Sequence, residues 1–172
     1  MRNILLLLFC CYGTSSLSQN PYAEDVQSPD QIMAALYESI SGDKGEKRDW
    51  DRFRYLFIPE ARLLPSGPNQ EDEMTYRIMS PDEYIKNAGK RLEADGFHEI
   101  EIARKTETFG SMVHIWSTYA SFRQQSDSQP FMRGINSIQL MYDGERWWIM
   151  QIYWRQESEA NPIPKVYLPQ DK

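Results

Sequence analysis

The sequence predicts an α+β fold in which three helices precede a sheet of mixed or antiparallel strands and pack on one of its faces. Two serine–proline–acid signatures, at residues 28–31 and 80–83, each open a run of apolar residues at helical spacing. From residue 97 onward the apolar residues alternate with a period of two, which is typical of strands. Helices followed by a long meander favour a sheet that carries its helices on one face.

The first eighteen residues have the layout of a signal peptide. Arg2 precedes an apolar run over residues 4–12, and mostly small residues follow up to Ser18. This run is too short to span a bilayer, which requires about 20 residues. We therefore expect cleavage after Ser18 and export to the periplasm or the exterior. Cys10 and Cys11 leave open a second interpretation, in which one of them is lipid-modified.

Charge and composition argue against several classes of function. The net charge of −6 repels phosphate backbones, so we expect no nucleic-acid partner. Both cysteines fall in the signal segment, which leaves the mature chain without a disulfide or a cysteine metal ligand. The sequence has no H-E-x-x-H, G-x-S-x-G or phosphate-loop motif, and we predict neither a metal nor a cofactor. No later segment is long and apolar enough to predict a membrane span.

After the signal segment, we expect a polar lead-in, one domain and a proline-containing tail, over residues 19–27, 28–157 and 158–172. Ser28 and Ser80 are each followed by a proline suited to the first helical turn, so both are expected to cap helices. Gly42 and Gly96 favour helix ends, and Pro59 stops a short aromatic helix that begins near Asp49. The tail is expected to be either extended along the domain or disordered.

The strand predictions follow from alternation and from turn residues. Gly110-Ser111 and Asp143-Gly144 are turn signals between the long strands. The predicted strands cover Ala61–Leu64, Met74–Met79, Phe97–Phe109, Met112–Gln124, Phe131–Asp143 and Arg146–Gln156.

A two-residue turn at Asp143-Gly144 determines which side chains of the last two strands share a face. The face expected to meet the helices carries Gly134, Asn136, Ile138, Leu140, Tyr142, Trp147, Ile149, Gln151 and Tyr153. The opposite face of the last strand carries Trp148, Met150, Ile152 and Trp154. Such a patch is large for a soluble monomer. We expect a homodimer through this outer face, and the alternative is that the tail folds back over it.

Four segments, in order, resemble the NTF2-like (SnoaL-like) superfamily. They are Trp50-x-x-Phe53-x-x-Leu56-Phe57-x-Pro59-x-Ala61, His114–Tyr119, Arg133–Leu140 and Asp143–Ile149. The resemblance covers about Asp30 to Gln156 and is closest to exported bacterial members of unassigned function. It implies a cone whose curved sheet encloses the helices and a pocket, and many members dimerise through the outer sheet face. Members include isomerases, dehydratases, cyclases, binding modules and transport factors, so the fold specifies no reaction.

Catalytic members of that superfamily usually place an Asp, Glu or His inside the cone, often with a tyrosine. His114 is the candidate general base if its strand face points inward, with Tyr119 as its partner; the alternative is a buried, hydrogen-bonded imidazole. Alternation with His98, Ile100 and Ile102 predicts that Glu99, Glu101 and Glu107 face solvent, so no inward carboxylate is expected. The predicted ligand-binding residues are Trp50, Trp116, Asn136, Tyr153 and Arg104.

Three functions remain open from the sequence. The first is binding of a small, partly apolar molecule in the cone without turnover. The second is a dehydratase or isomerase in which His114 moves a proton and Tyr119 or Asn136 stabilises an oxyanion. The third is a protein-interaction module that uses the outer sheet face.

Overall fold

The computed structural model describes residues 20–170, so the predicted signal peptide, with Cys10 and Cys11, lies outside the described residues. The helical elements are η1 (Ala23–Val26), α1 (Pro29–Ile40), α2 (Trp50–Tyr55), α3 (Pro81–Tyr84), the π-helical η2 (Ile85–Gly89), α4 (Lys90–Asp95) and η3 (Lys165–Tyr167). The strands are β1 (Phe57–Pro68), β2 (Met74–Tyr76), β3 (His98–Phe109), β4 (Met112–Phe122), β5 (Met132–Tyr142) and β6 (Trp147–Gln156).

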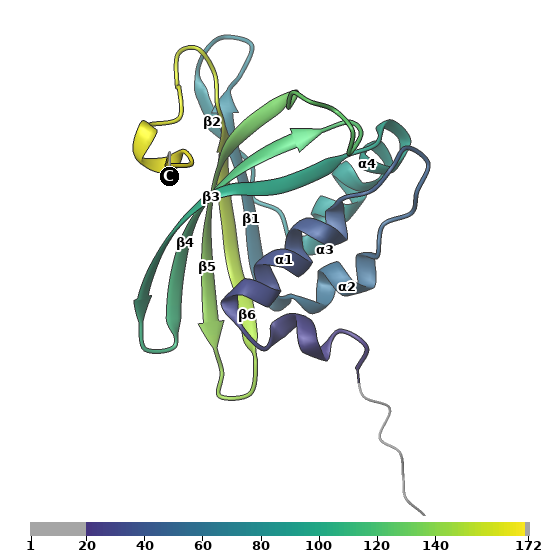
Figure 1. The fold of residues 1–172 in the computed structure, drawn as a ribbon, viewed down its shortest axis with the longest axis vertical. Coiled ribbons are helices and arrows are strands. Elements are labelled where there is room, and N and C mark those ends of the chain that lie inside the picture. The colour runs from purple at the N-terminus through teal and green to yellow at the C-terminus, as the bar shows by residue number, and fades with distance from the viewer. Residues whose placement is uncertain (1–19, 171–172) are drawn as a thin grey trace, which may run out of the picture.

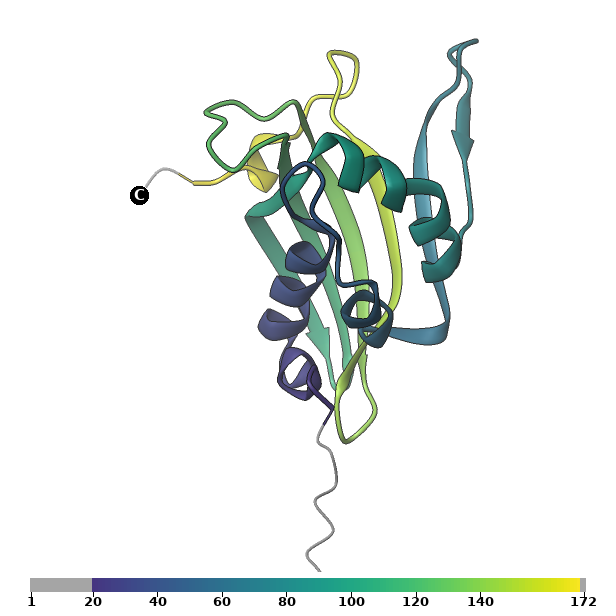
Figure 2. The same ribbon diagram turned by 90° about the vertical axis from the view of Figure 1, so that its right-hand side faces the viewer.

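The strands form one curved sheet in the order β2-β1-β6-β5-β4-β3. β1 and β6 are parallel, whereas the other neighbours are antiparallel. Helices α1 to α4 cover one face of this sheet, and the C-terminal segment crosses the other face (Figure 1; Figure 2). The predicted α+β class with a mixed sheet around N-terminal helices is therefore confirmed. Within residues 20–170, no helix combines the length and apolar character that crossing a membrane requires.

The two serine caps form as the sequence predicts. The Ser28 side chain accepts a hydrogen bond from the Gln31 backbone N–H at the start of α1. Ser80 and Glu83 make a reciprocal capping box at the start of α3. The helix predicted from Ser80 is not a uniform α-helix, because the π-helical η2 separates α3 from α4.

The core lies between the helices and the concave face of the sheet. Its fully buried members include Ile32 and Met33 from α1, Phe53 from α2, and sheet residues Ile115, Ile138, Leu140 and Ile149. The predicted lead-in also packs here, since Val26 of η1 is buried. These contacts place α1 and α2 against the middle of the sheet.

A β-bulge in β6 reverses the predicted faces of its second half. Leu140 pairs with Ile149 but Gln139 pairs with Gln151, so Met150 is an extra residue in the strand. Beyond it, Ile152 is buried in the core, whereas Tyr153 is exposed on the outer face. The prediction that Trp148, Met150, Ile152 and Trp154 form one outer patch was therefore wrong, as was the inward assignment of Gln151 and Tyr153.

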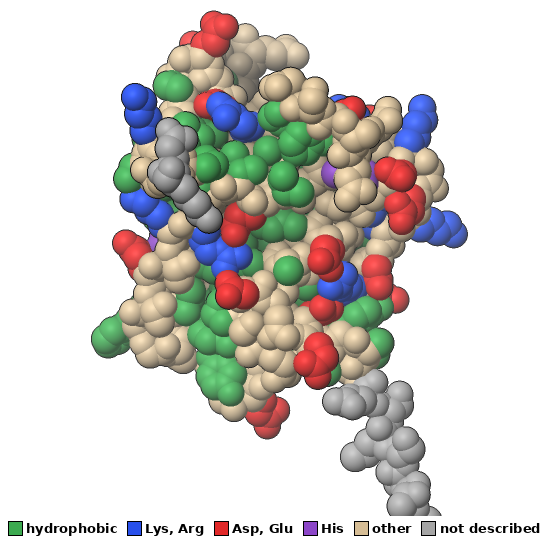
Figure 3. Space-filling view, viewed as in Figure 1, with side chains coloured by type: hydrophobic (Ala, Val, Ile, Leu, Met, Phe, Trp, Pro, Cys, Tyr) green, Lys and Arg blue, Asp and Glu red, His purple; other side chains and the backbone are tan. Residues whose placement is uncertain are grey.

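The C-terminal segment, residues 158–170, folds back over the upper part of the outer face. Ile163 is buried, and the Thr118 hydroxyl donates a 2.6 Å hydrogen bond to the Tyr167 carbonyl. The rings of Trp116 and Tyr167 lie 5.7 Å apart between centroids. This covering by the tail is the alternative that the sequence left open. Farther down, apolar side chains remain at the surface near the ends of both long hairpins (Figure 3).

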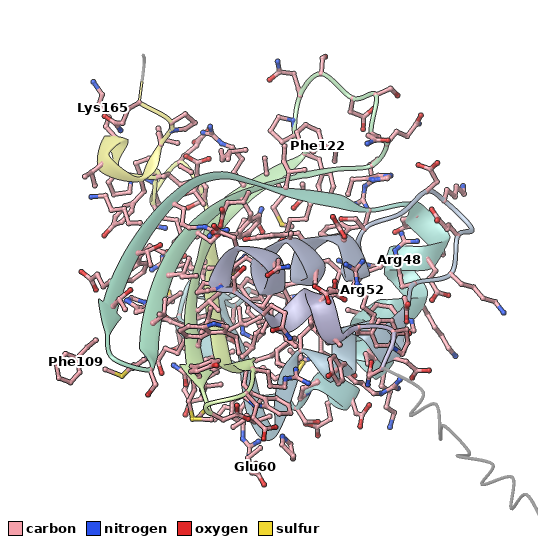
Figure 4. All side chains as sticks on the ribbon, turned by 60° about the horizontal axis from the view of Figure 1, so that its bottom comes forward. Arg48, Arg52, Glu60, Phe109, Phe122 and Lys165 are labelled. Atoms are coloured by element: carbon pink, nitrogen blue, oxygen red, sulfur yellow. The ribbon has the colours of Figure 1, made fainter. Side chains whose placement is uncertain are left out.

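A buried arginine connects the end of α1 to α4 and to the loop between α1 and α2. The Arg48 guanidinium donates hydrogen bonds to the carbonyls of Ile40 at 3.0 Å, Gly42 at 2.6 Å, Glu46 at 2.6 Å and Leu92 at 3.0 Å. Arg48 as a whole is only 6% exposed. Figure 4 shows Arg48 beside α4, at the end of α1. One side chain thus satisfies carbonyls that the two helix ends and the loop leave unpaired.

We expect Arg48→Met to lower the free energy of unfolding by roughly 2–4 kcal/mol, because several buried carbonyls lose their donor at once. Urea unfolding followed by tryptophan fluorescence measures this loss. Lys47→Met, at the exposed neighbouring position, is the matched control and is expected to change stability by less than about 0.5 kcal/mol. Equal losses in the two variants would contradict the assigned role.

Candidate functional site

A cavity of about 280 Å³ lies between the helices and the concave face of the sheet. Most of its wall is apolar, with contributions from Leu36, Phe53, Leu63, Phe97 and Ile152. The polar side chains that reach it are Tyr37, Tyr84, Arg91, Glu99, Tyr119 and Asn136. A mostly apolar pocket with a few convergent polar groups is the usual form of a small-molecule site.

Glu99 is fixed at its backbone by the end of α1. The Glu99 N–H donates to the Ser41 hydroxyl at 2.9 Å, directly after α1. Next to this contact, Gly42 and Phe97 exchange backbone hydrogen bonds of 2.8 and 3.0 Å. The Glu99 carboxylate then accepts a 2.8 Å hydrogen bond from the Ser121 hydroxyl on β4. These contacts direct the carboxylate to the concave side of the sheet.

Burial raises the pKa of Glu99 from its ordinary value of 4.5 to about 7. Hydrogen bonds from Ser121 and Asn136 favour the ionised form and oppose this shift, but removal from water is the larger effect. Both protonation states are therefore populated near neutral pH. A carboxyl group with this property can accept and return a proton within one reaction cycle.

Asn136 and Tyr37 form a hydrogen-bonded chain behind Glu99. The Asn136 amide donates to the Tyr37 hydroxyl at 3.1 Å, and that hydroxyl lies 2.6 Å from the Ser117 hydroxyl. Ser117 donates in turn to Glu101. Because Ser117 uses its proton on Glu101, Tyr37 is the donor to Ser117. Burial raises the pKa of Tyr37, so its phenol stays protonated within this chain.

Two further tyrosines present hydroxyls to the cavity. Burial raises the pKa of both Tyr84 and Tyr119, and the charge of Glu99 adds to the effect. Neither hydroxyl has a hydrogen-bond partner among residues 20–170. Gly134 makes room for one of them, since a Cβ there would lie 2.4 Å from the Tyr119 hydroxyl oxygen. The two phenols remain neutral donors that are available to a ligand oxygen.

The expectation that Glu99 and Glu101 face solvent was wrong. They pair with Ser121 and Tyr119, which lie on the concave face of β4. Ile100, which the alternation assigned inward, is instead 50% exposed. Only the Glu107 assignment agrees with the structure, because Glu107 pairs with His114 on the outer face. Sequence reasoning thus missed the one carboxylate that reaches the cavity.

Of the seven predicted site residues, Tyr119 and Asn136 line the cavity. Trp50 lies on α2, where its indole N–H donates to Glu93 at 3.0 Å. Arg104 pairs with Glu101 at 2.6 Å and with Asp30 at 2.5 Å. The other three, His114, Trp116 and Tyr153, lie on the outer face of the sheet.

His114 cannot act on a molecule in the cavity, because it is on the opposite side of the sheet. Its Nε2 atom lies 2.9 Å from the Ser137 hydroxyl, and its Nδ1 atom lies 3.4 Å from Glu107. This is the order of a serine–histidine–carboxylate relay. However, Ser137 is on a central strand paired on both sides, so the neighbouring backbone N–H groups belong to the sheet ladder. An acyl-transfer site also needs donors for the oxyanion, which that ladder does not leave free.

Metal binding finds no support in the described part of the chain. No group of three or more His, Asp, Glu or Cys side chains comes together there in a way that could hold an ion. The side chains that line the cavity can support proton transfer by Glu99 and hydrogen bonding by the phenols and the Asn136 amide.

No protein-family model matches the sequence, and comparison with curated proteins also gives no match. Solved structures do match in fold. A protein of unknown function with a cystatin-like fold from Nostoc punctiforme aligns with a TM-score of 0.57 at 9% identity, over 76% of this chain and 89% of that one. An NTF2-like protein of unknown function from Silicibacter pomeroyi aligns at 0.50 and 13% identity, over 74% and 92% of the two chains.

A third structure, from Parabacteroides distasonis, belongs to a protein that has been proposed to be a ketosteroid isomerase. It aligns with a TM-score of 0.52 at 12% identity, over 80% of this chain and 98% of that one. The six-stranded curved sheet with helices on its concave face is the fold that these proteins share. The chain described here therefore has the NTF2-like fold, as the resemblance in its sequence implied. At these identities the likeness extends to the fold alone.

The raised pKa of Glu99 predicts a pH-dependent stability difference between the wild type and Glu99→Gln. Below pH 4.5 both the folded and the unfolded chain hold this proton. Between 4.5 and about 7 the unfolded chain loses it first, so the contribution of Glu99 to folding stability falls and then stays low.

Glutamine does not titrate, so the variant is expected to gain about 1–3 kcal/mol relative to the wild type between pH 4 and pH 8. Urea unfolding at both pH values measures this gain. Glu145→Gln, at an exposed position in the turn between β5 and β6, is the control and should show no such change. A pH-independent difference for Glu99→Gln would argue against the shifted carboxyl.

Proposed function

We propose that the protein binds a small, partly apolar carbonyl compound in its cavity and that Glu99 moves a proton on the carbon beside the carbonyl group. One observation carries this proposal. Glu99, with a pKa of about 7, shares an apolar cavity with the tyrosine hydroxyls of Tyr84 and Tyr119, which have no partner among residues 20–170. A base and oxyanion donors thus face the same space.

In the proposed step, ionised Glu99 takes a proton from the α-carbon, and the C–H electron pair enters an enolate. The negative charge that develops on the carbonyl oxygen receives hydrogen bonds from Tyr119 or Tyr84. If the substrate also has a carbon–carbon double bond that is conjugated with this enolate, protonated Glu99 returns the proton to the far carbon of that double bond. The double bond has then moved, which completes an isomerisation. If the β-carbon carries a hydroxyl, its departure as water with that proton completes a dehydration.

Asn136 and Tyr37 act on Glu99 rather than on the substrate. The Asn136 amide contributes to the hydrogen bonding of the ionised carboxylate and is itself held by the Tyr37 hydroxyl at 3.1 Å. This arrangement limits the rise in the pKa of Glu99, so that the base form is still available near neutral pH. This chain also shares its fold with a protein that has been proposed to be a ketosteroid isomerase.

Binding without turnover is the second candidate function. The apolar wall and the small volume of about 280 Å³, just below the usual range of ligand pockets, favour it. Under this alternative Glu99 would be a hydrogen-bonding anchor. The exchange experiment below separates the two functions, because only the first requires a carbon-bound proton to leave.

We also propose that the protein is exported after cleavage at Ser18, on the basis of the layout of its first residues. Mass spectrometry of protein recovered from its own source would then give a mature chain that begins at Gln19. A chain that retains residue 1 would contradict this proposal.

We still propose a homodimer through the outer face of the sheet, but through other residues of that face than the sequence suggested. The outer face below the C-terminal segment exposes Phe109 and Met112, at 81% and 59%, with Trp148 nearby on the same side of the sheet. Figure 4 shows Phe109 directed away from the molecule at the tip of its hairpin. A second copy of this chain is the proposed occupant of this face; a different protein partner would make it the interaction module that the sequence left open.

Sedimentation of the mature chain, residues 19–172, tests the dimer. The wild type is expected to sediment as a dimer, and Met112→Glu is expected to shift it toward monomer by placing a charge in the contact. Lys90→Glu, at an exposed position on the helical side of the sheet, should have little effect. A wild type that is monomeric at high micromolar concentration would rule the dimer out.

Proton transfer is tested with 2-tetralone, a compact apolar ketone with acidic α-protons, incubated with the protein in D₂O. Loss of the α-proton signal in NMR spectra is expected to accelerate as pH rises through about 7, because the base must be ionised. Glu99→Gln should slow the exchange by roughly 10²–10⁴-fold.

Glu107→Gln is the carboxylate control and should retain the wild-type rate. Binding of the ketone without exchange would favour the second candidate function. Equal rates for the wild type and Glu99→Gln would exclude Glu99 as the base.

A further inference from the structure

Arg91 belongs to the cavity wall by its position on the helix. The wall contributions from this part of the chain come from Tyr84, Ala88, Arg91 and Leu92. Their spacing is that of a single helical stripe. The segment is α3, η2 and α4 rather than one regular helix, but these residues share the side that meets the cavity. A core-facing side usually carries apolar residues, so a cation at this position is the exception. Its neighbour Lys90 is exposed and does not line the cavity.

The charge of Arg91 is not neutralised within the described part of the chain. No carboxylate in residues 20–170 makes an ion pair with it. The two acids on its own helix have other partners. Glu93 accepts from the Trp50 indole at 3.0 Å, and Asp95 lies 4.0 Å from Arg123.

Arg91 and Glu99 both line the cavity, and Tyr84 belongs to the same wall. Tyr84 is affected by both charges, since that of Glu99 raises its pKa and that of Arg91 lowers it. Most of the remaining wall is apolar, so a ligand that reaches both charged groups must be apolar in its middle part.

We propose that the ligand carries a carboxylate that pairs with Arg91 while its apolar body extends into the cavity toward Glu99. Resting on the proposed function, this inference defines the substrate class as small apolar keto acids. A planar guanidinium binds a carboxylate through two parallel hydrogen bonds, which also orients the ligand. A single arginine matches a monoanion better than a phosphate dianion.

The net negative charge of the chain means that binding of an anion depends on a local cation such as Arg91. The net charge of −6 repels anions at long range, so attraction to an anion must come from a local group. Because Arg91 is solvent-exposed, the contribution of the ion pair should weaken as salt is added.

The experiment compares 3-phenylpropanoate with its neutral counterpart 3-phenylpropanamide by calorimetric titration of the full mature chain. The wild type is expected to bind the carboxylate at least tenfold more tightly than the amide at low salt. Arg91→Gln is expected to lose this preference through weaker binding of the carboxylate. Lys90→Gln removes the same charge from the adjacent exposed position and should keep the preference. 3-Phenylpropyl phosphate serves as the phosphate arm and is expected to bind more weakly than the carboxylate.

Four outcomes would overturn the inference: equal affinities of the wild type for the two probes, an unchanged preference in Arg91→Gln, tighter binding of the phosphate, or no binding of either probe. Its failure can be distinguished from failure of the proposed function. If Arg91 does not select the carboxylate but 2-tetralone still exchanges its proton through Glu99, only the substrate class is wrong. If Arg91 selects the carboxylate but no exchange occurs, the cavity binds apolar acids without turnover.

Discussion

The geometry of this protein depends on the connection between the end of α1 and the start of β3. Gly42 and Phe97 exchange backbone hydrogen bonds, and the Ser41 hydroxyl accepts a hydrogen bond from the Glu99 N–H. The Arg48 guanidinium donates hydrogen bonds to backbone carbonyls around this point. The last carbonyls of a helix have no partner within the helix, so each one that is buried needs a hydrogen-bond donor from elsewhere. Here one buried guanidinium meets that requirement, so the first residues of β3 are held against the helical layer. The position of Glu99 is a consequence of this connection.

Glu99 illustrates how a fold maintains a costly group. A carboxyl removed from water resists ionisation, and the raised pKa expresses the resulting loss of stability at neutral pH. Hydrogen bonds from Ser121 and Asn136 reduce that loss without cancelling it. The surrounding apolar core supplies enough stability for the site to persist. An ionisable group whose pKa is shifted by burial inside a cavity is a frequent feature of functional sites.

Much of the fold could be predicted from the sequence, because its determinants are local. Serine caps, prolines at first helical turns and the alternation after residue 97 placed the helices and strands β3 to β6 close to their observed bounds. β1, in contrast, was predicted only as Ala61–Leu64 and extends over Phe57–Pro68. The site was harder to predict, because two β-bulges shift the side-chain faces and leave no clear signal in one sequence. One precedes Ala103 in β3 and the other adds Met150 to β6. Alternation also gives the wrong assignment on β3 itself. Ile100 is apolar but exposed on the outer face, whereas the charged Glu99 lies on the concave face that apolar residues usually occupy.

The C-terminal segment has a practical consequence for how the molecule can be handled. It leaves the domain on the convex side of the sheet, whereas the cavity is enclosed on the side of the helices (Figure 1). A fluorophore, affinity tag or sensor surface attached through this segment would therefore lie on the convex side, with the sheet between it and the cavity. Attachment there should leave the cavity undisturbed.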